Sequence, residues 1–139
     1  MKIHEFNPII YPYKLWVTFP INPTELNGKF KDNKYDLDFT YLKNYEYEAI
    51  TQQVIEKQTE NIGAIVLFYP KYNHSCKTIS HEAFHVAEKI YNMIGADITD
   101  EPFAYLIGWV VECLEKVKIE YENSLLIDEK ASLIVSIQN

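Results

Sequence analysis

The sequence IGAIVLFY, at residues 62–69, constrains the fold most strongly. It is a short apolar run rich in β-branched and aromatic residues, and Pro70 ends it. Runs of this length and composition are typical of buried β-strands rather than of helices, which usually need ten residues or more. The sequence therefore predicts that this run is a strand in a small sheet.

Two further segments complete the predicted sheet. Residues 49–57 lie just upstream and are expected to pair with 62–69 as an antiparallel hairpin that turns at 59–61. Residues 13–19, YKLWVTF, form the other strand candidate. The prolines and the Asn-Gly pair within 20–33 indicate a loop. A last short strand is expected within 132–137.

Two helices are predicted after the sheet. The first carries an apolar stripe at helical spacing, and Gly95 follows it as a left-handed C-cap. That stripe consists of Ile79, Ala83, Val86, Ile90 and Ile94. The second helix is expected to begin at Asp100, which can serve as its N-cap, and its body at 103–111 is apolar around most of its circumference. The expected fold class is α+β, with a small antiparallel sheet packed against this helix pair in one domain, 1–139.

Charge and composition narrow the possible partners. The formal net charge is −7 and all 13 basic residues are lysine, which argues against nucleic acid as a partner. No apolar run is long enough to cross a bilayer, and the N-terminal residues do not resemble a signal peptide. We therefore expect no membrane partner and a cytoplasmic protein, in which Cys76 and Cys113 are buried free thiols.

The motif HEAFH lies on the first predicted helix. His81 and His85 are one turn apart and face the same way, so both imidazoles can reach one Zn²⁺ at about 2.1 Å. Glu82 lies about 100° further around the helix, where it can reach a metal-bound water without being a ligand itself. The motif therefore predicts a zinc site. The alternative is a solvated helix with two unliganded histidines.

A catalytic zinc site needs a third protein ligand, and four acidic residues downstream are candidates: Asp97, Asp100, Glu101 and Glu112. HEAFH followed by DEPFAY resembles the gluzincin metallopeptidases, especially the aminopeptidase N-like pattern HExxH…NEGFAxY. The segment EPFAYLIGW, at 101–109, also resembles a group of small phage and bacterial HExxH proteins, which favours a phage-encoded origin. These resemblances cover about 62–118 and imply that Glu101 is the third ligand.

Helix geometry favours a different carboxylate. If the first helix runs to Ile94, its end lies about 13 Å beyond His85. A second helix that runs back antiparallel from Asp100 would then be level with His85 near Glu112. The resemblance thus favours Glu101, whereas a straight helical hairpin favours Glu112.

The functional prediction is a zinc-dependent metallopeptidase that acts on a peptide or protein substrate, with Glu82 as general base. The strand at 62–69 is the expected template for an extended substrate, and specificity is expected to lie in 20–45. Two alternatives are a catalytically silent, zinc-stabilised structural or binding protein of phage type and an interaction domain without metal.

Three other side chains could contribute to such a site. His74 is expected to be solvated, with a metal or substrate role as the alternative. Tyr105 is expected to be a surface tyrosine, although it could donate a hydrogen bond to an oxyanion. Glu88 could orient the free ring nitrogen of His85, or it could simply be solvated.

Overall fold

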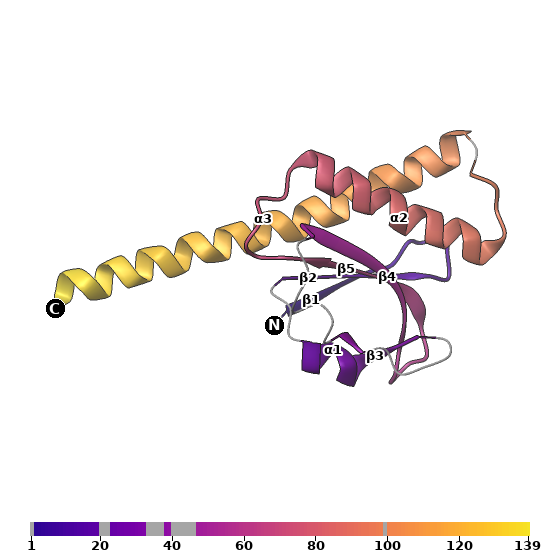
Figure 1. The fold of residues 1–139 in the computed structure, drawn as a ribbon. Coiled ribbons are helices and arrows are strands. Elements are labelled where there is room, and N and C mark those ends of the chain that lie inside the picture. The colour runs from indigo at the N-terminus through magenta and orange to yellow at the C-terminus, as the bar shows by residue number, and fades with distance from the viewer. Residues whose placement is uncertain (1, 20–22, 33–37, 40–46, 99) are drawn as a thin grey trace.

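The computed structural model describes residues 2–19, 23–32, 38–39, 47–98 and 100–139. A five-stranded sheet separates two long helices from one short helix (Figure 1). In chain order the elements are β1 (Lys2–Phe6), β2 (Lys14–Phe19), α1 (Pro23–Lys29), β3 (Phe30–Lys31), β4 (Ala49–Glu56), β5 (Ile62–Phe68), α2 (Cys76–Ile94) and α3 (Asp100–Gln138). The α+β fold class is confirmed.

The sheet has the strand order β1-β2-β5-β4-β3, so β5 lies at its centre. β5 pairs with β4 antiparallel and with β2 parallel. The expectation of an antiparallel sheet is therefore wrong at one pairing: the sheet is mixed. The parallel pairing arises because the chain from β2 passes through α1, β3 and β4 before it returns beside β2. Because β5 has a neighbour on each side, it cannot serve as the edge template predicted for a substrate strand.

The alternation of side chains along the strands creates two cores. On one face, residues such as Leu15, Val17 and Val66 pack against the apolar sides of α2 and α3. On the other face, Trp16 and Ile65 pack with Leu26 of α1. The sheet is thus buried on both faces, which explains why β2 and β5 are almost continuously apolar.

The hairpin of β4 and β5 is confirmed, with Ala49 paired to Phe68 and Ile55 to Ile62. Its turn is closed by the Glu56 amide, which donates to the Asn61 carbonyl at 2.9 Å. Glu60 occupies the left-handed region at φ 58°. The structure therefore confirms the predicted turn at 59–61.

The N-terminal region differs most from the sequence-based expectation. Part of the predicted loop at 20–33 forms α1 and β3, and the chain begins with an edge strand, β1, that was not predicted. Pro23 is tolerated in the first turn of α1, and fully buried Leu26 anchors this helix despite the following Asn27 and Gly28. Burial against the sheet outweighs the local turn preference of this segment.

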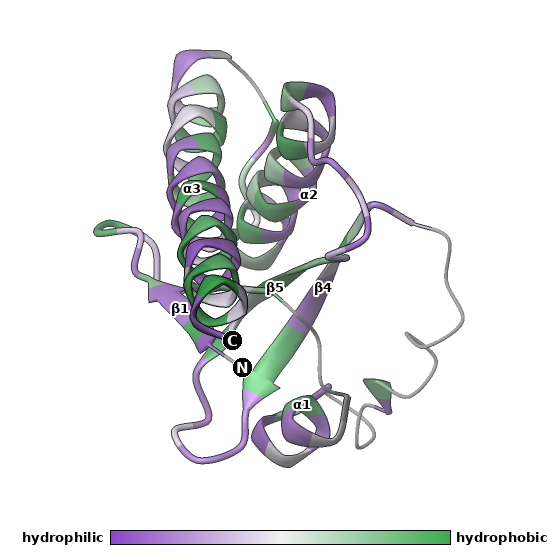
Figure 2. Cartoon of the chain, turned by 90° about the vertical axis from the view of Figure 1, so that its left-hand side faces the viewer, coloured by the Kyte–Doolittle hydropathy of each residue, from purple (hydrophilic) through white to green (hydrophobic). Residues whose placement is uncertain are grey.

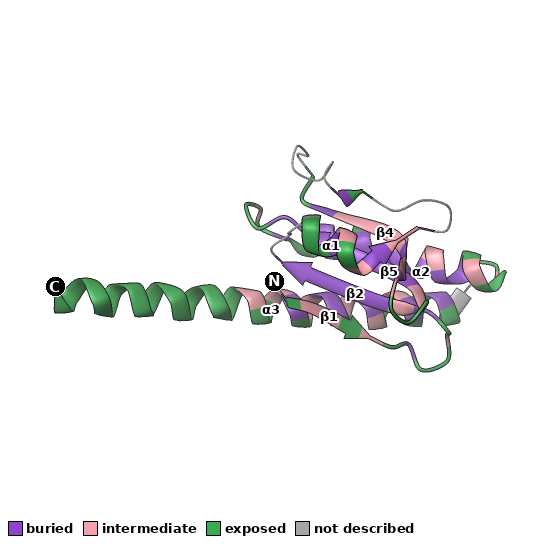
Figure 3. Cartoon of the chain, turned by 90° about the horizontal axis from the view of Figure 1, so that it is seen from below, coloured by how far each residue is buried: buried purple, intermediate pink, exposed green. Residues whose placement is uncertain are grey.

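α2 ends as predicted at Gly95, which has φ 68° and whose amide donates to the Asn92 carbonyl at 3.4 Å. α3 is far longer than expected, because it continues through 132–137, where a last strand was predicted. Its first half packs on α2 and the sheet, and its second half projects beyond the domain (Figures 1 and 3). The β-branched residues at 132–137 thus belong to an exposed helix. No helix in the described ranges is both long and apolar enough to span a membrane.

The close approach of β5 to β2 gives a test of this sheet. A Cβ on Gly63 would lie 2.2 Å from the Lys14 carbonyl oxygen and 2.6 Å from the Trp16 ring. We expect Gly63→Ala to lower the free energy of unfolding by about 2–3 kcal/mol, because the backbone of β2 must move to relieve the clash. Urea unfolding measures this change.

Gly108→Ala is the matched control. A Cβ at this position meets nothing within 4 Å. Alanine favours helix over glycine at an exposed position such as this one in α3. We therefore expect the free energy of unfolding to stay unchanged or to rise by up to about 1 kcal/mol. Equal stability of Gly63→Ala and wild type would contradict the parallel pairing of β2 with β5.

Candidate metal centre on α2

The two histidines of the HEAFH motif converge on the outer face of α2. The Nε2 atoms of His81 and His85 lie 3.1 Å apart, with the rings nearly perpendicular at 83°. A cation about 2.1 Å from both nitrogens fits this separation. The same distance also fits a hydrogen bond between two neutral imidazoles, one acting as donor and the other as acceptor. The pair is therefore arranged to share either a proton or a metal ion.

Glu82 points in another direction, towards the sheet. Its residue is only 5% exposed, and its Oε2 accepts a hydrogen bond of 2.5 Å from the Thr51 hydroxyl on β4. Glu82 follows His81 by about 100° around the helix, which brings it from the solvent side to the edge of the buried stripe. One carboxylate oxygen is thus held by Thr51.

A pocket of about 220 Å³ lies between α2 and the start of β4. Its lining includes His81, Glu82 and Glu48, and the Glu48 carboxylate accepts a hydrogen bond from the Thr78 hydroxyl. Glu82 is thus a buried carboxylate at a pocket whose rim carries one of the paired histidines. The pocket thus brings a histidine of the HEAFH motif and two carboxylates, those of Glu48 and Glu82, to one lining.

The predicted third ligand does not join this group. Phe103 faces α2, with its ring 5.8 Å from that of Phe84 and 4.9 Å from that of Tyr91. Glu101 is two residues earlier, so it lies nearly opposite Phe103 around α3, and it is exposed. Glu112 is exposed on that same outer side. Among the described residues, no three His, Cys, Asp or Glu side chains gather closely enough to hold a metal.

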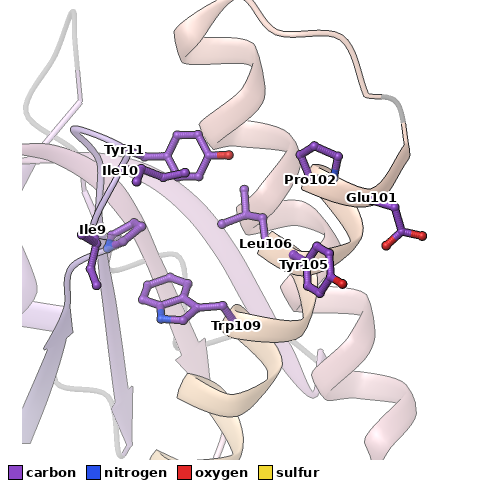
Figure 4. A pocket seen from close by; sticks show the side chains of 9 residues that line it. Ile9, Ile10, Tyr11, Glu101, Pro102, Tyr105, Leu106 and Trp109 are labelled. Atoms are coloured by element: carbon purple, nitrogen blue, oxygen red, sulfur yellow. The ribbon is translucent and has the colours of Figure 1, made fainter.

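Glu101 instead lies at the edge of an apolar groove of about 510 Å³ between α3 and the turn that connects β1 to β2. Figure 4 shows its carboxylate directed away from the aromatic side chains of this groove. The groove is lined chiefly by Ile9, Ile10, Tyr11, Tyr105, Leu106 and Trp109. Tyr105 is 75% exposed there, as expected for a surface tyrosine.

His74 was expected to be solvated, and this expectation is wrong. It is buried, and its Nε2 lies 2.9 Å from the Glu48 carbonyl oxygen, to which it donates. Its ring packs edge-on against Phe19 and Phe68, at centroid distances of 5.2 and 4.8 Å. His74 thus fixes the chain before α2 to the chain before β4.

The remaining candidates are arranged more simply. Glu88 Oε2 lies 3.7 Å from His85 Nδ1, which is an ion-pair distance if His85 is protonated and too long for a good hydrogen bond. Cys113 is a buried free thiol whose pKa burial raises to about 11. Cys76 is also free but exposed, which corrects the expectation that both thiols are buried.

The contact of Thr51 with Glu82 was not predicted from the sequence. The signal was the alternation of β4, in which Ala49 and Thr51 occupy the face towards α2 while Val54 occupies the other. A polar side chain on a helix-facing strand position needs a partner, because a buried hydroxyl without one is costly. The identity of that partner depends on the placement of α2 over β4, which the sequence does not give.

His74 makes stability depend on pH. Burial, the largest cause, lowers its pKa below the ordinary 6.5, although the Glu48 carbonyl opposes this shift. As the pH falls below about 6.5, the unfolded chain therefore binds a proton that the folded chain does not, and stability falls with it. One such group changes the free energy of unfolding by at most about 1.4 kcal/mol per pH unit.

We expect urea midpoints measured from pH 7.5 down to 5 to fall more steeply for the wild type than for His74→Gln. The glutamine cannot titrate but retains an amide that can donate to the Glu48 carbonyl. Parallel curves for the two proteins would exclude His74 as a source of the acid sensitivity.

Comparison with known proteins adds no relative: the chain matches no family model, no curated protein and no solved structure.

Proposed function

We propose that the chain is a zinc-dependent metallopeptidase whose centre is the His81–His85 pair. The observation that carries the proposal is the convergence of the two Nε2 atoms to 3.1 Å, beside a pocket that also holds the Glu82 carboxylate. Two histidines at this spacing with an intervening glutamate are the arrangement that metallopeptidases use. Glu101 is the proposed third ligand, by its resemblance to the gluzincin pattern.

The residues fit a zinc ion in part. The two imidazoles can bind one cation, whereas Glu101 reaches them only if the first turn of α3 rearranges on binding. When bound, zinc would lower the pKa of a water towards 7 and polarise a carbonyl group.

In this proposal Glu82 accepts the proton of the attacking water and passes it to the leaving amine. Thr51 holds one oxygen of Glu82 at 2.5 Å, so the other oxygen is left to take the proton. Thr51 is thus a positioning residue. The buried setting restricts the carboxylate to few rotamers, which keeps the base in a fixed position relative to the histidines.

The placement of Glu101 favours a second candidate function, a catalytically silent zinc protein. Glu101 is exposed on the side of α3 that faces away from α2. If solvent or another molecule completes the coordination instead, zinc would stabilise the fold at α2 without hydrolysis. Zinc bound to the purified protein would be consistent with both candidate functions. Catalysis must therefore be tested separately.

The metal site is tested by zinc content after purification without a histidine tag. We expect about one zinc per wild-type chain, and loss of it in His81→Ala and His85→Ala, because too few donors remain for tight binding. His4→Ala is the matched control, since His4 lies on β1 beside Glu120 and should keep the metal. Full retention of zinc by both α2 variants would eliminate the site.

The same measurement identifies the third ligand. Glu101→Gln should lose zinc while Glu112→Gln keeps it, and the opposite result would assign the ligand to Glu112. Retention in both variants would mean that neither Glu101 nor Glu112 is a ligand, which favours the silent zinc protein.

The general base is tested with Glu82→Gln. We expect this variant to keep zinc but to lose cleavage of a mixed peptide library by roughly 10²- to 10⁴-fold, because an amide cannot accept the proton. Mass spectrometry of the library detects the products, and Glu115→Gln on α3 is the matched control. Equal cleavage by Glu82→Gln and wild type would refute the mechanism, and a zinc-loaded wild type without cleavage would favour the silent protein.

A further inference from the structure

Beyond Tyr121, whose ring stacks on Phe19, no other element of the described chain buries α3. Residues 122–138 are exposed throughout and extend from the domain for about 25 Å (Figure 3). A helical segment of this length is marginal in water unless one of its faces packs against another surface. The projecting segment therefore needs a partner to remain helical.

The apolar face of α3 changes sides where the helix leaves the domain. Up to Val117, the buried residues of α3, such as Leu106 and Val110, face the sheet and α2. Beyond this point, six large apolar residues lie on roughly the opposite side of the helix, by the 100° step per residue. They are Ile119, Leu126, Ile127, Leu133, Ile134 and Ile137, and each is more than half exposed.

The side that continues the buried face is mainly polar, with Ser124, Asp128 and Ser132, and Val135 is an exposed apolar residue on it. In Figure 2, which looks along α3 from its C-terminal end, hydrophobic and hydrophilic segments alternate along the projecting part. Because the apolar stripe faces away from the sheet of its own chain, this chain cannot fold back to cover it. An exposed apolar stripe of this size marks an interaction surface.

We propose that the stripe binds the same stripe of a second copy of this chain, as an antiparallel helix pair. Ile119, Leu126 and Leu133 repeat every seven residues, and Ile137 continues the row at a spacing of four. Both domains lie behind their own helices, so two copies can join their stripes without collision between the domains. The interaction is independent of the metal centre on α2.

Charge selects the antiparallel orientation. Lys130 is the one basic residue within 122–138, and it lies within the stripe. A parallel pair would place Lys130 against its own copy. An antiparallel pair with its two-fold axis between residues 129 and 130 brings Lys130 level with Glu129 of the partner, at the border of the stripe, and Leu126 level with the partner's Leu133.

Charge also argues against a membrane surface. Residues 119–138 contain Glu120, Glu122, Asp128 and Glu129 against the single Lys130. Helices that bind anionic bilayers carry basic residues beside the apolar face, and this helix carries the opposite charge. A second copy of the chain supplies both an apolar stripe and the complementary charges.

The test is sedimentation equilibrium of the full chain. We expect wild type to be a dimer and Leu133→Asp to raise the dimer dissociation constant by roughly 100-fold, because a carboxylate enters the apolar seam. Val135→Asp is the matched control: Val135 is exposed to a similar degree, at 58% against 61%, but lies on the other side of the helix. Far-UV circular dichroism should show that Leu133→Asp also loses helix, since the projecting segment is then unsupported.

Charge exchange tests the orientation. Glu129→Lys and Lys130→Glu should each weaken the dimer, and the double variant should restore it, because the opposed charges are complementary again. In a Cys76→Ser background, a mixture of Leu126→Cys and Leu133→Cys chains should form the mixed disulfide rather than either symmetric one. A monomeric wild type, an unchanged Leu133→Asp dimer, or a wild type that stays monomeric but binds vesicles of anionic lipid would each overturn the proposal, and symmetric disulfides would overturn its orientation.

Discussion

The packing of α2 on the sheet is the interaction on which the rest of the structure depends. Ala83, Val86 and Ile90 are fully buried where α2 packs over β4 and β5. Because these three positions fix the rotation of α2, they also fix where every other residue of this helix points. His81 and His85 are turned outward as a pair, and Glu82 is turned towards β4. The chemistry of the candidate site is a consequence of hydrophobic packing on the opposite side of the same helix.

The two sides of the candidate centre differ in how firmly they are held. Glu82 is buried and hydrogen-bonded to Thr51, and His74 attaches the chain before α2 to that before β4 through the Glu48 carbonyl. The histidine pair is on the surface, where it has its mutual contact, Glu88 and the ring of Phe84 as neighbours. A metal ion between the histidines would make this side as fixed as the other. Glu82 is therefore positioned by the fold, whereas the fold leaves the two histidine side chains less constrained.

α3 serves two different surfaces with one continuous helix. Its first half completes the core, and residues such as Val110 and Leu114 are fully buried. Its second half presents apolar residues on the opposite side, at Leu126 and Leu133, where the domain offers them no cover. Burial of apolar side chains is favourable in both halves, but only the first half can bury them within one chain. This difference explains how one sequence specifies both a folded domain and an exposed interaction surface.

The sequence by itself determined the features that depend on neighbours along the chain. The apolar run at 62–69, the hairpin turn at 59–61, the stripe of α2 and its cap at Gly95 all follow from local periodicity and turn chemistry, and so does the shared direction of His81 and His85. Only the tertiary structure decided the features that depend on residues far apart in sequence. These are the parallel pairing of β2 with β5, the helix at Pro23–Lys29 stabilised by buried Leu26, the contact of Thr51 with Glu82, and the direction of Glu101. The last of these was beyond sequence reasoning because Phe103, by packing on Tyr91, sets the rotation of α3, and no spacing within one helix reveals how it is turned against another.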